Sequence, residues 1–260
     1  MKLFLFGGTG NQLFQLSRAL ELRKTNTNIE IVTLNRWAFF DLYKLLRWTR
    51  HSHFINLEVL IKEIGLEAKP ITFNDIIALF VTFMQKKMKI TNEFDSLEHK
   101  KFNIGYYQKS KFHDNKLLKE IASTVNNKFK TISSDCPVIH VRGGDFKFSE
   151  RISAAKLQTI LNRLLIDINN NSKLSVFIAT DDRQYCLKIL ENTDYKYHFG
   201  NSLNEDITQV LSSQVVVASN STFCFWLCLA SSNLQKLYIP RNSVFSDFIH
   251  LFSCEVNYYD

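Results

Sequence analysis

The chain opens on a short hydrophobic run, followed by a glycine turn and a stretch of apolar residues at helical spacing. Lys2–Phe6 predicts a strand, Gly7–Gly10 a turn and Asn11–Arg23 a helix. A second strand is predicted at Ile29–Leu34. Strands joined through a helix pair in parallel, and ligands of such sheets bind at the carboxyl ends of the strands. The pattern therefore points to the glycine turn, which follows the first strand, as a candidate site.

The second half of the chain alternates strands and helices again. Four buried strands are predicted, at Val138–Val141, Leu174–Ala179, Val215–Ala218 and Leu237–Ile239. Four helices are predicted, at Ser153–Asn169, Arg183–Glu191, Asp206–Ser213 and from Phe223 onward. Each polar cluster of this half falls where a strand ends and a helix starts. An α/β sheet presents its chemistry at that edge.

A polar-rich segment, Asn126–Asp135, separates the two halves. The chain has 260 residues, about the length of two average domains. We therefore expect an α/β protein with two Rossmann-like domains of parallel sheet, residues 1–130 and 131–260, which face each other across a cleft.

Composition and charge narrow the class of protein. Hydrophobic residues make up 45% and charged residues 22% of the chain, which is typical of a globular protein. The net charge of +7 favours an anionic partner, whether nucleotide, nucleic acid or anionic lipid. Between Gln85 and Lys130 stand eleven lysines and five acidic residues. This stretch predicts a basic face or an ordinary solvated surface, and its lysines and aromatic residues do not interleave as in a nucleic-acid module.

Cysteine usage and hydrophobicity favour a cytoplasmic protein. The five cysteines are an odd number without a C-x-x-C pair, which suits buried thiols in a reducing compartment. The apolar residues before Gly7 are too few for a signal-peptide core. No uninterrupted apolar run reaches the length that spans a bilayer, and Val210–Ala230 is interrupted by polar residues.

The opening glycines do not form a known nucleotide fingerprint. Gly8 and Gly10 begin a G-x-G-x-x-G motif, but Leu13 stands where the third glycine belongs, and a P-loop is absent. A glycine turn still lets the backbone approach a ligand, and Asn11 and Gln12 offer amide groups at a helix start. A capped tight turn explains the same residues equally well.

The segment His140-Val-Arg-Gly-Gly-Asp145 is more informative. A buried strand delivers His140 and Arg142, two residues apart and hence on one side, into a glycine loop. The planar guanidinium binds phosphate oxygens in bidentate fashion, so Arg142 suits a diphosphate and can neutralise a leaving group as charge develops. The alternative is a structural ion pair of Arg142 with Asp145 or Asp182.

Three further polar clusters are candidates. Ser219-Asn-Ser-Thr222 precedes a helix and offers donors to a phosphate at the helix N-terminus, although an ordinary N-cap explains it too. Asp181-Asp182 could recognise a ribose, a base or a metal, but the pair lacks the D-x-D spacing with which many metal-dependent transferases hold a nucleotide-bound cation. Asp206 could simply be an acid in the first turn of its helix.

Five segments, in order along the chain, resemble glycosyltransferase family 11, the bacterial alpha-1,2-fucosyltransferases. Gly7-Gly-Thr-Gly-Asn-Gln-Leu-Phe-Gln15 resembles the opening G-G-x-G-N-Q-x-F-Q, and Gly105-Tyr-Tyr-Gln108 resembles G-Y-x-Q. His140-Val-Arg-Gly-Gly-Asp145 is similar to H-x-R-R-x-D. Phe177-Ile-Ala-Thr-Asp-Asp182 resembles the strand that ends in paired aspartates, and Asn220-Ser-Thr-Phe-Cys-Phe-Trp226 resembles N-S-S/T-F-S-W-W.

The resemblance implies the GT-B arrangement, a GDP-sugar donor bound by the C-terminal half, an acceptor side in the N-terminal half, and inversion at the anomeric carbon without a metal or other cofactor. It assigns Arg142 to the β-phosphate, Asp206 to guanine, and Asn11 to the reacting centre. Asp145 is a candidate base by proximity. The expected catalytic residues are thus Arg142, Asn11 and Asp145, and the expected donor-binding residues are Gly8, Gly10, His140, Arg142, Asp181, Asp182, Asp206, Asn220, Ser221 and Thr222.

The expected activity is transfer of L-fucose from GDP-fucose to a galactoside in bacterial surface-glycan (O-antigen) assembly. The acceptor is expected to be a lipid-linked oligosaccharide, met by peripheral contact with anionic lipid at the inner face of the cytoplasmic membrane. Gly143 departs from the resemblance, since it stands where the family has a second arginine; Cys224 and Phe225 also depart from it. The alternatives are another GDP-deoxysugar such as GDP-colitose, an inactive sugar-nucleotide binder, or a basic nucleic-acid-binding protein.

Overall fold

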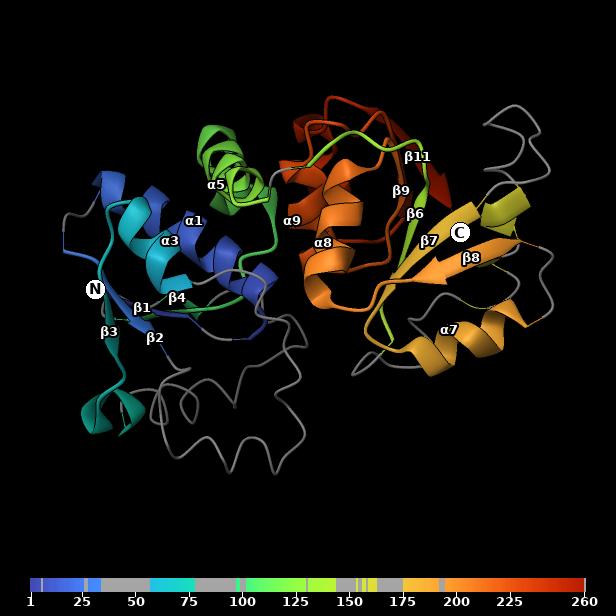
Figure 1. Ribbon diagram of the computed structural model, residues 1–260. Helices are drawn as coiled ribbons and strands as arrows, with labels where there is room; N and C mark the ends of the chain where they lie inside the picture. Colours follow the sequence, from blue (N-terminus) through green and yellow to red (C-terminus); the bar gives the residue numbers. More distant parts are fainter. Residues whose placement is uncertain are drawn as a thin grey trace. The chain divides into compact units, whose positions relative to one another are not determined.

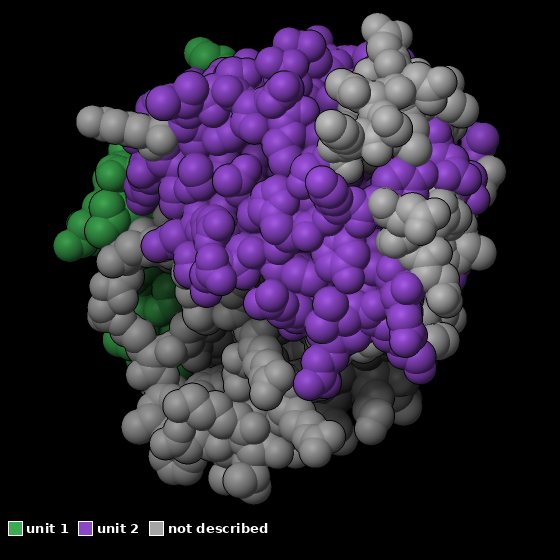
Figure 2. Space-filling model, turned by 45° about the vertical axis from the view of Figure 1, so that its right-hand side comes forward, with its two compact units in different colours: residues 1–118 green, residues 119–260 purple. Residues whose placement is uncertain are grey.

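The computed structural model describes residues 1–5, 7–25, 28–33, 57–77, 97–98, 102–129, 131–143, 153, 156–157, 159–162, 175–191 and 195–259. These residues belong to two compact units (Figures 1 and 2), Met1–Leu118 and Lys119–Asp260. Asp145 and the densest part of the basic stretch, Lys86 to Lys89 with His99 to Lys101, lie outside the described residues.

The first unit is a sheet with helices, built from short elements. In chain order these are β1 (Lys2–Leu5), α1 (Thr9–Thr25), β2 (Glu30–Thr33), α3 (Leu57–Glu63), β3 (Ala68–Pro70), β4 (Leu97–Glu98), β5 (Phe102–Ile104), a 3₁₀ turn (Ser110–Phe112) and α5 (Asn115–Asn127). The division between the two units falls within α5.

The sheet of the first unit has the order β3-β2-β1-β5-β4. All neighbours pair in parallel except β4, which is antiparallel to β5. Leu3, Phe4 and Leu5 of β1 are completely buried, because the central strand is covered on both faces. The chain enters α1 directly after β1, so the glycine turn lies at the carboxyl edge of this parallel pair.

The second unit is built around a fully parallel sheet. Its elements are β6 (Val138–Val141), β7 (Ser175–Thr180), α7 (Arg183–Leu190), β8 (Lys196–Phe199), α8 (Leu203–Ser212), β9 (Val215–Val217), α9 (Thr222–Ala230), β10 (Lys236–Pro240), a 3₁₀ helix (Ser246–Leu251) and β11 (Glu255–Tyr259). The strand order is β11-β10-β9-β6-β7-β8. The chain thus progresses in one direction from β6 and in the other from β9, so the switch point of the sheet lies between β6 and β9.

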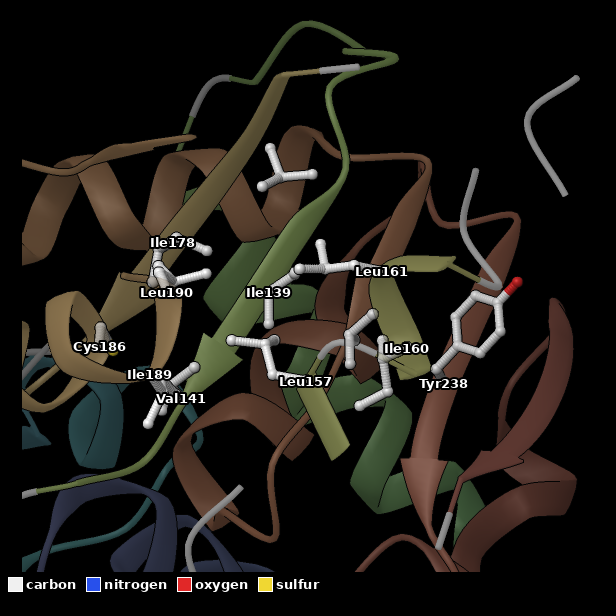
Figure 3. Packing of buried hydrophobic residues seen from close by; sticks show 12 residues of the cluster. Ile139, Val141, Leu157, Ile160, Leu161, Ile178, Cys186, Ile189, Leu190 and Tyr238 are labelled. Atoms are coloured by element: carbon white, nitrogen blue, oxygen red, sulfur yellow. The ribbon is translucent and has the colours of Figure 1, made fainter. Parts of the chain in front are cut away.

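Alternating side chains of β6 point to opposite faces of this sheet. Figure 3 shows Ile139 and Val141 on one face, packed in a cluster with Leu157, Cys186 and Ile189. His140 points the other way, and its ring centroid lies 5.6 Å from that of Phe223 in α9. Helices α7 and α9 therefore cover opposite faces (Figure 1), and burial on both sides explains why β6 reads as a continuous apolar run apart from His140.

The expectation of an α/β chain with parallel sheets is confirmed in both units. The predicted strand at Val138–Val141 has the same bounds as β6. Two helix starts were wrong: α1 begins at Thr9, so Gly10 lies inside the helix rather than in the turn, and α8 begins at Leu203 behind the cap Ser202. Ser202 accepts a hydrogen bond from the Glu205 backbone N–H, and this cap starts α8 ahead of Asp206.

Candidate functional site

Ser219 joins the ends of the two strands at the switch point of the second unit. Its backbone N–H donates to the carbonyl of His140 at 3.2 Å. Its hydroxyl oxygen lies 2.7 Å from Nδ1 of His140 and accepts from the backbone N–H of Arg142 at 3.2 Å. The residues after β9 therefore hold the last residues of β6 in place, at the edge where Rossmann-like sheets bind ligands.

His140 lies almost completely buried in this network, with 4% of its surface exposed. Burial, and then the nearby positive charge of Arg142, lower the pKa of His140 to about 3. The imidazole is therefore neutral at physiological pH, and it can take part in hydrogen bonding without adding charge to the site.

Arg142 is held by the first aspartate after β7. Its Nη1 lies 2.8 Å from Oδ2 of Asp181, while Oδ1 of Asp181 accepts from the Gly143 backbone N–H at 2.7 Å. The register explains this contact, because His140 pairs with Ala179 and the residues two positions later lie side by side. Asp181 is thus an ion-pair partner of Arg142 that the sequence analysis did not consider, while Asp145 lies outside the described residues.

Gly143 and Asp182 lie in close contact. A Cβ added at residue 143 would lie 2.3 Å from the Cβ of Asp182, so only glycine fits this backbone. Asp182 is the N-cap of α7 and accepts from the Tyr185 backbone N–H at 3.1 Å. Glycine at position 143 therefore permits a close approach between the loop after β6 and the start of α7.

Asp206 lies on α8, beside the end of β7. Its Oδ1 is buried and has no hydrogen-bond partner among the described residues, and the Thr180 backbone N–H bonds the carboxylate. Burial, and then the neighbouring charge of Glu205, raise the pKa of Asp206 to about 7. A Cβ on Gly200 would lie 2.2 Å from Oδ1, so the chain passes very close to the carboxylate.

The turn after β9 leads directly into α9. Ser221 is the N-cap of α9, and Thr222 is its first residue, so backbone N–H groups and two hydroxyls gather at the positive end of the helix. Asn220 has a different role, since its Oδ1 accepts from the Val244 backbone N–H at 3.0 Å and holds the loop after β10.

In the first unit, the glycine turn and the end of β5 lie together at the corresponding switch point. Gln108 Nε2 donates to Asn11 Oδ1 at 2.9 Å. Gly7 has a φ of 81°, and a Cβ there would lie 3.1 Å from Asn11 Nδ2 and 3.3 Å from the Tyr106 ring. Glycine at position 7 thus provides both the left-handed backbone and the room for the Asn11 amide.

Two buried glutamines of α1 hydrogen-bond the backbone around this site. Gln12 Nε2 donates to the Gly7 carbonyl at 2.7 Å, and Gln15 Nε2 donates to the Gly105 carbonyl at 3.0 Å. The Gly8 carbonyl accepts from the Gln12 backbone N–H at 3.1 Å. The glutamines of α1 therefore hold the backbone on both sides of Asn11, at the glycine turn and after β5.

The structure brings His140, Arg142 and Asp181 together in the second unit, and it places Gly8, Gly10 and Asn11 in the first. Ser219 belonged to a candidate cluster but not to the final set of expected donor-binding residues, and Gln108 was not among the expected site residues. The polar cluster after the predicted strand, and the G-Y-x-Q segment, were the signals that pointed to them.

Among the described residues, no group of three or more His, Cys, Asp or Glu side chains is placed to hold a metal ion. None of the described helices is long and apolar enough to cross a bilayer.

No protein-family model and no curated protein matches this sequence. Solved structures similar to the chain include the E. coli heptosyltransferase WaaC with ADP (10% identity, TM-score 0.44, covering 99% of this chain and 93% of that chain). WaaC with ADP-2-deoxy-2-fluoro heptose has 9% identity and a TM-score of 0.42, covering 94% and 90%. POFUT1 in complex with GDP-fucose has 13% identity and a TM-score of 0.40, covering 99% and 97%.

Proposed function

We propose that this chain is a sugar-nucleotide glycosyltransferase, and more specifically an inverting, metal-independent alpha-1,2-fucosyltransferase that transfers L-fucose from GDP-fucose to a galactoside. The observation that carries the proposal is the position of Arg142 at the switch point of a fully parallel sheet, where its backbone N–H bonds Ser219, two residues before the N-cap of α9. A guanidinium and a helix N-terminus at this edge are suited to a nucleotide diphosphate.

The proposed chemistry is stabilisation of the departing GDP. As the bond to the sugar breaks, negative charge develops on the β-phosphate, and Arg142 neutralises it in place. His140, Ser221 and Thr222 would add hydrogen bonds without further charge. Asp206 would read guanine, which requires its buried Oδ1 to become accessible, and Asn11 would act at the reacting centre. Asp145 remains the candidate base for the acceptor hydroxyl.

Metal independence is also a proposal. It is supported by the roles of the paired aspartates: Asp181 is already bonded to Arg142 and Gly143, and Asp182 caps α7. Neither arrangement resembles the spaced carboxylates that hold a nucleotide-bound cation. We accordingly expect no cofactor besides the GDP-sugar substrate.

A different GDP-deoxysugar, such as GDP-colitose, is the second candidate donor. The observation that favours it is Gly143, because the family's second arginine would collide with Asp182 in this backbone. Loss of one cation changes the recognition of the donor while leaving the class of reaction intact.

For the acceptor, we propose a galactose-containing, lipid-linked oligosaccharide in O-antigen assembly, reached by peripheral contact with anionic lipid on the cytoplasmic side. The basic stretch between Gln85 and Lys130 supports this partner. Replacing three of its lysines with glutamine should reduce binding to anionic vesicles at low salt. Unchanged binding would remove the membrane from the proposal and leave the donor chemistry standing.

A thermal-shift panel tests the central proposal. A ligand that binds only the native state raises the melting temperature, by an amount that grows with its concentration above Kd. GDP and GDP-fucose should stabilise the protein, whereas UDP-galactose, NAD and a short DNA duplex should not. Stabilisation by a UDP-sugar but not by GDP would overturn it. Binding of GDP-fucose without release of GDP onto any galactoside would instead identify an inactive binder.

A further inference from the structure

The contact between Ser219 and His140 bears on which ring nitrogen of His140 carries the hydrogen. A neutral imidazole carries one hydrogen, on Nδ1 or on Nε2, and the two tautomers present opposite hydrogen-bonding groups to a ligand. Nδ1 lies 2.7 Å from the Ser219 hydroxyl oxygen, which is hydrogen-bond distance for either tautomer. The other partners of that hydroxyl decide between the two.

The Ser219 oxygen already accepts the backbone N–H of Arg142 at 3.2 Å. If Nδ1 were protonated, the oxygen would accept two hydrogen bonds and its own hydrogen would need a third partner. Ser219 has only 5% of its surface exposed, and no such acceptor is found among the described residues. A buried hydroxyl hydrogen without an acceptor is unfavourable, because the group loses its hydrogen bond to water on folding and gains none in return.

We infer that the Ser219 hydroxyl donates to Nδ1 of His140 and thereby holds the imidazole as the tautomer with its hydrogen on Nε2, which makes His140 a hydrogen-bond donor to a phosphate oxygen. Ser219 is then a positioning residue. The hydrogen-bond chain runs from the Arg142 backbone N–H to Ser219 and on to His140. The position of the Nε2 hydrogen on His140 therefore depends on a hydroxyl that the Arg142 backbone holds in place.

The role at the phosphate rests on the proposed function, but the tautomer is a property of the ligand-free protein. The low pKa of His140, caused first by its burial, keeps the ring neutral over the physiological range, so one tautomer can persist there. A neutral N–H donor suits a site that already holds the guanidinium of Arg142, because a second positive charge beside it would be repelled.

The first unit supplies an internal reference. His113 Nδ1 lies 3.0 Å from the Ser17 hydroxyl, and its Nε2 lies 2.5 Å from the carbonyl oxygen of Tyr107. A carbonyl only accepts, so His113 must carry its hydrogen on Nε2. Burial lowers the pKa of His113 to about 4, and His113 is therefore neutral as well.

Nitrogen-15 NMR of the full chain with labelled histidine tests the inference directly. Long-range proton–nitrogen spectra distinguish protonated from unprotonated ring nitrogens, and the His140 signals are identified by their loss in His140→Gln. In the ligand-free protein at pH 7, we expect His140 to match His113, with Nδ1 unprotonated and Nε2 protonated. A protonated Nδ1 in His140 would overturn the inference, and this reading needs no variant at Ser219.

Variants then test the role of the hydroxyl. Ser219→Ala should shift His140 toward a mixture of tautomers, whereas Ser231→Ala, which removes a hydroxyl bonded to the Leu211 carbonyl at 2.8 Å, should leave it unchanged. An unchanged His140 spectrum in Ser219→Ala would contradict the positioning role. If Ser219→Ala does not fold, the wild-type spectrum decides alone.

Affinity for GDP separates this inference from the proposed function. A glutamine amide nitrogen lies near the position of Nε2, and an asparagine amide nitrogen near that of Nδ1. His140→Gln should keep GDP affinity within about threefold, while His140→Asn should lose about tenfold. Equal losses in both variants would refute the Nε2 donor. Absence of GDP binding by the wild type would refute the proposed function and leave the tautomer to the NMR result.

Discussion

The guanidinium of Arg142 and the carboxylate of Asp181 form an ion pair at 2.8 Å, at the carboxyl ends of two neighbouring strands. Both groups are partly accessible, with 17% of the Arg142 side chain and 34% of the Asp181 side chain exposed. A partly exposed pair contributes little to stability, about 1 kcal/mol or less. Under the proposed function, a phosphate of the donor would replace Asp181 as the partner of Arg142.

Replacing Arg142 should affect turnover far more than folding. Arg142→Ala should lower kcat by about 100-fold or more, because a charged donor to the leaving group is lost. Its free energy of unfolding should change by about 1 kcal/mol at most. The kcat of Arg142→Lys should lie between those of the wild type and Arg142→Ala, because lysine keeps the charge but not the planar guanidinium. Steady-state kinetics and urea unfolding measure both quantities, and a near-wild-type kcat for Arg142→Ala would remove Arg142 from the reaction.

Asp181→Asn should strengthen GDP binding. The asparagine oxygen can still accept from the Gly143 N–H, but it no longer neutralises Arg142, so the guanidinium becomes fully available to a phosphate. We expect affinity to rise about two- to tenfold at low salt, and less at high salt because the interaction is screened. Calorimetric titration at two salt concentrations measures this. Asp135→Asn, which removes an exposed carboxylate elsewhere in the second unit, is the matched control. Weaker binding in Asp181→Asn alone would mean that Asp181 orients Arg142 instead of competing for it.

Gly143→Ala should destabilise the second unit through a single contact. The added methyl would lie 2.3 Å from Cβ of Asp182, and such overpacking costs about 1–3 kcal/mol. Adding Asp182→Gly removes the opposing Cβ, and glycine is only a few tenths of a kcal/mol worse than aspartate as an N-cap. The double variant should therefore recover most of the loss, which urea unfolding of the four proteins would measure. Strictly additive losses would contradict the contact.

The carboxyl of Asp206 should make stability fall as pH rises. Its pKa is about 7 in the folded protein against 3.8 for the unperturbed group, so between these values the folded state binds the extra proton. The stabilisation of the folded state by this proton is fully present below about pH 4 and is lost as pH rises through 7. Relative to Asp206→Asn, the wild type should lose stability across that interval. The buried His140 and His113 act in the opposite direction, but they contribute equally to both proteins. A pH-independent difference would contradict the raised pKa.

Gln108→Glu should disturb Asn11 without changing the donor site. The glutamine amide donates to Asn11 Oδ1 at 2.9 Å, and a carboxylate of the same shape cannot donate. Loss of this bond should cost about 1 kcal/mol of stability. Under the proposed function, kcat should fall while the Kd for GDP stays the same. Gln214→Glu, at a half-buried glutamine whose side-chain hydrogen bond to Ser133 is exposed, is the control for the added charge. A weaker GDP affinity with unchanged kcat would argue against a role for Asn11 in the reaction.

The sequence by itself determined the α/β class, the central strands and the edges at which polar groups gather. Strands such as β6 are buried on both faces, so their apolar runs stand out without any knowledge of their neighbours. The edge strands β8 and β11 were not predicted. Lys196–Phe199 alternates exposed and half-buried residues, and such short, half-solvated strands lack that signal.

The partners within the site were decided only by the tertiary structure. Arg142 meets Asp181 because β6 pairs with β7 in one register, and a shift of one residue would have turned the other face toward it. Ser219 meets His140 because β9 joins the opposite side of β6, although 79 residues separate the two in the chain. Residue types and local patterns specify which groups reach the edge of the sheet. Strand order and register decide which of them can share a hydrogen.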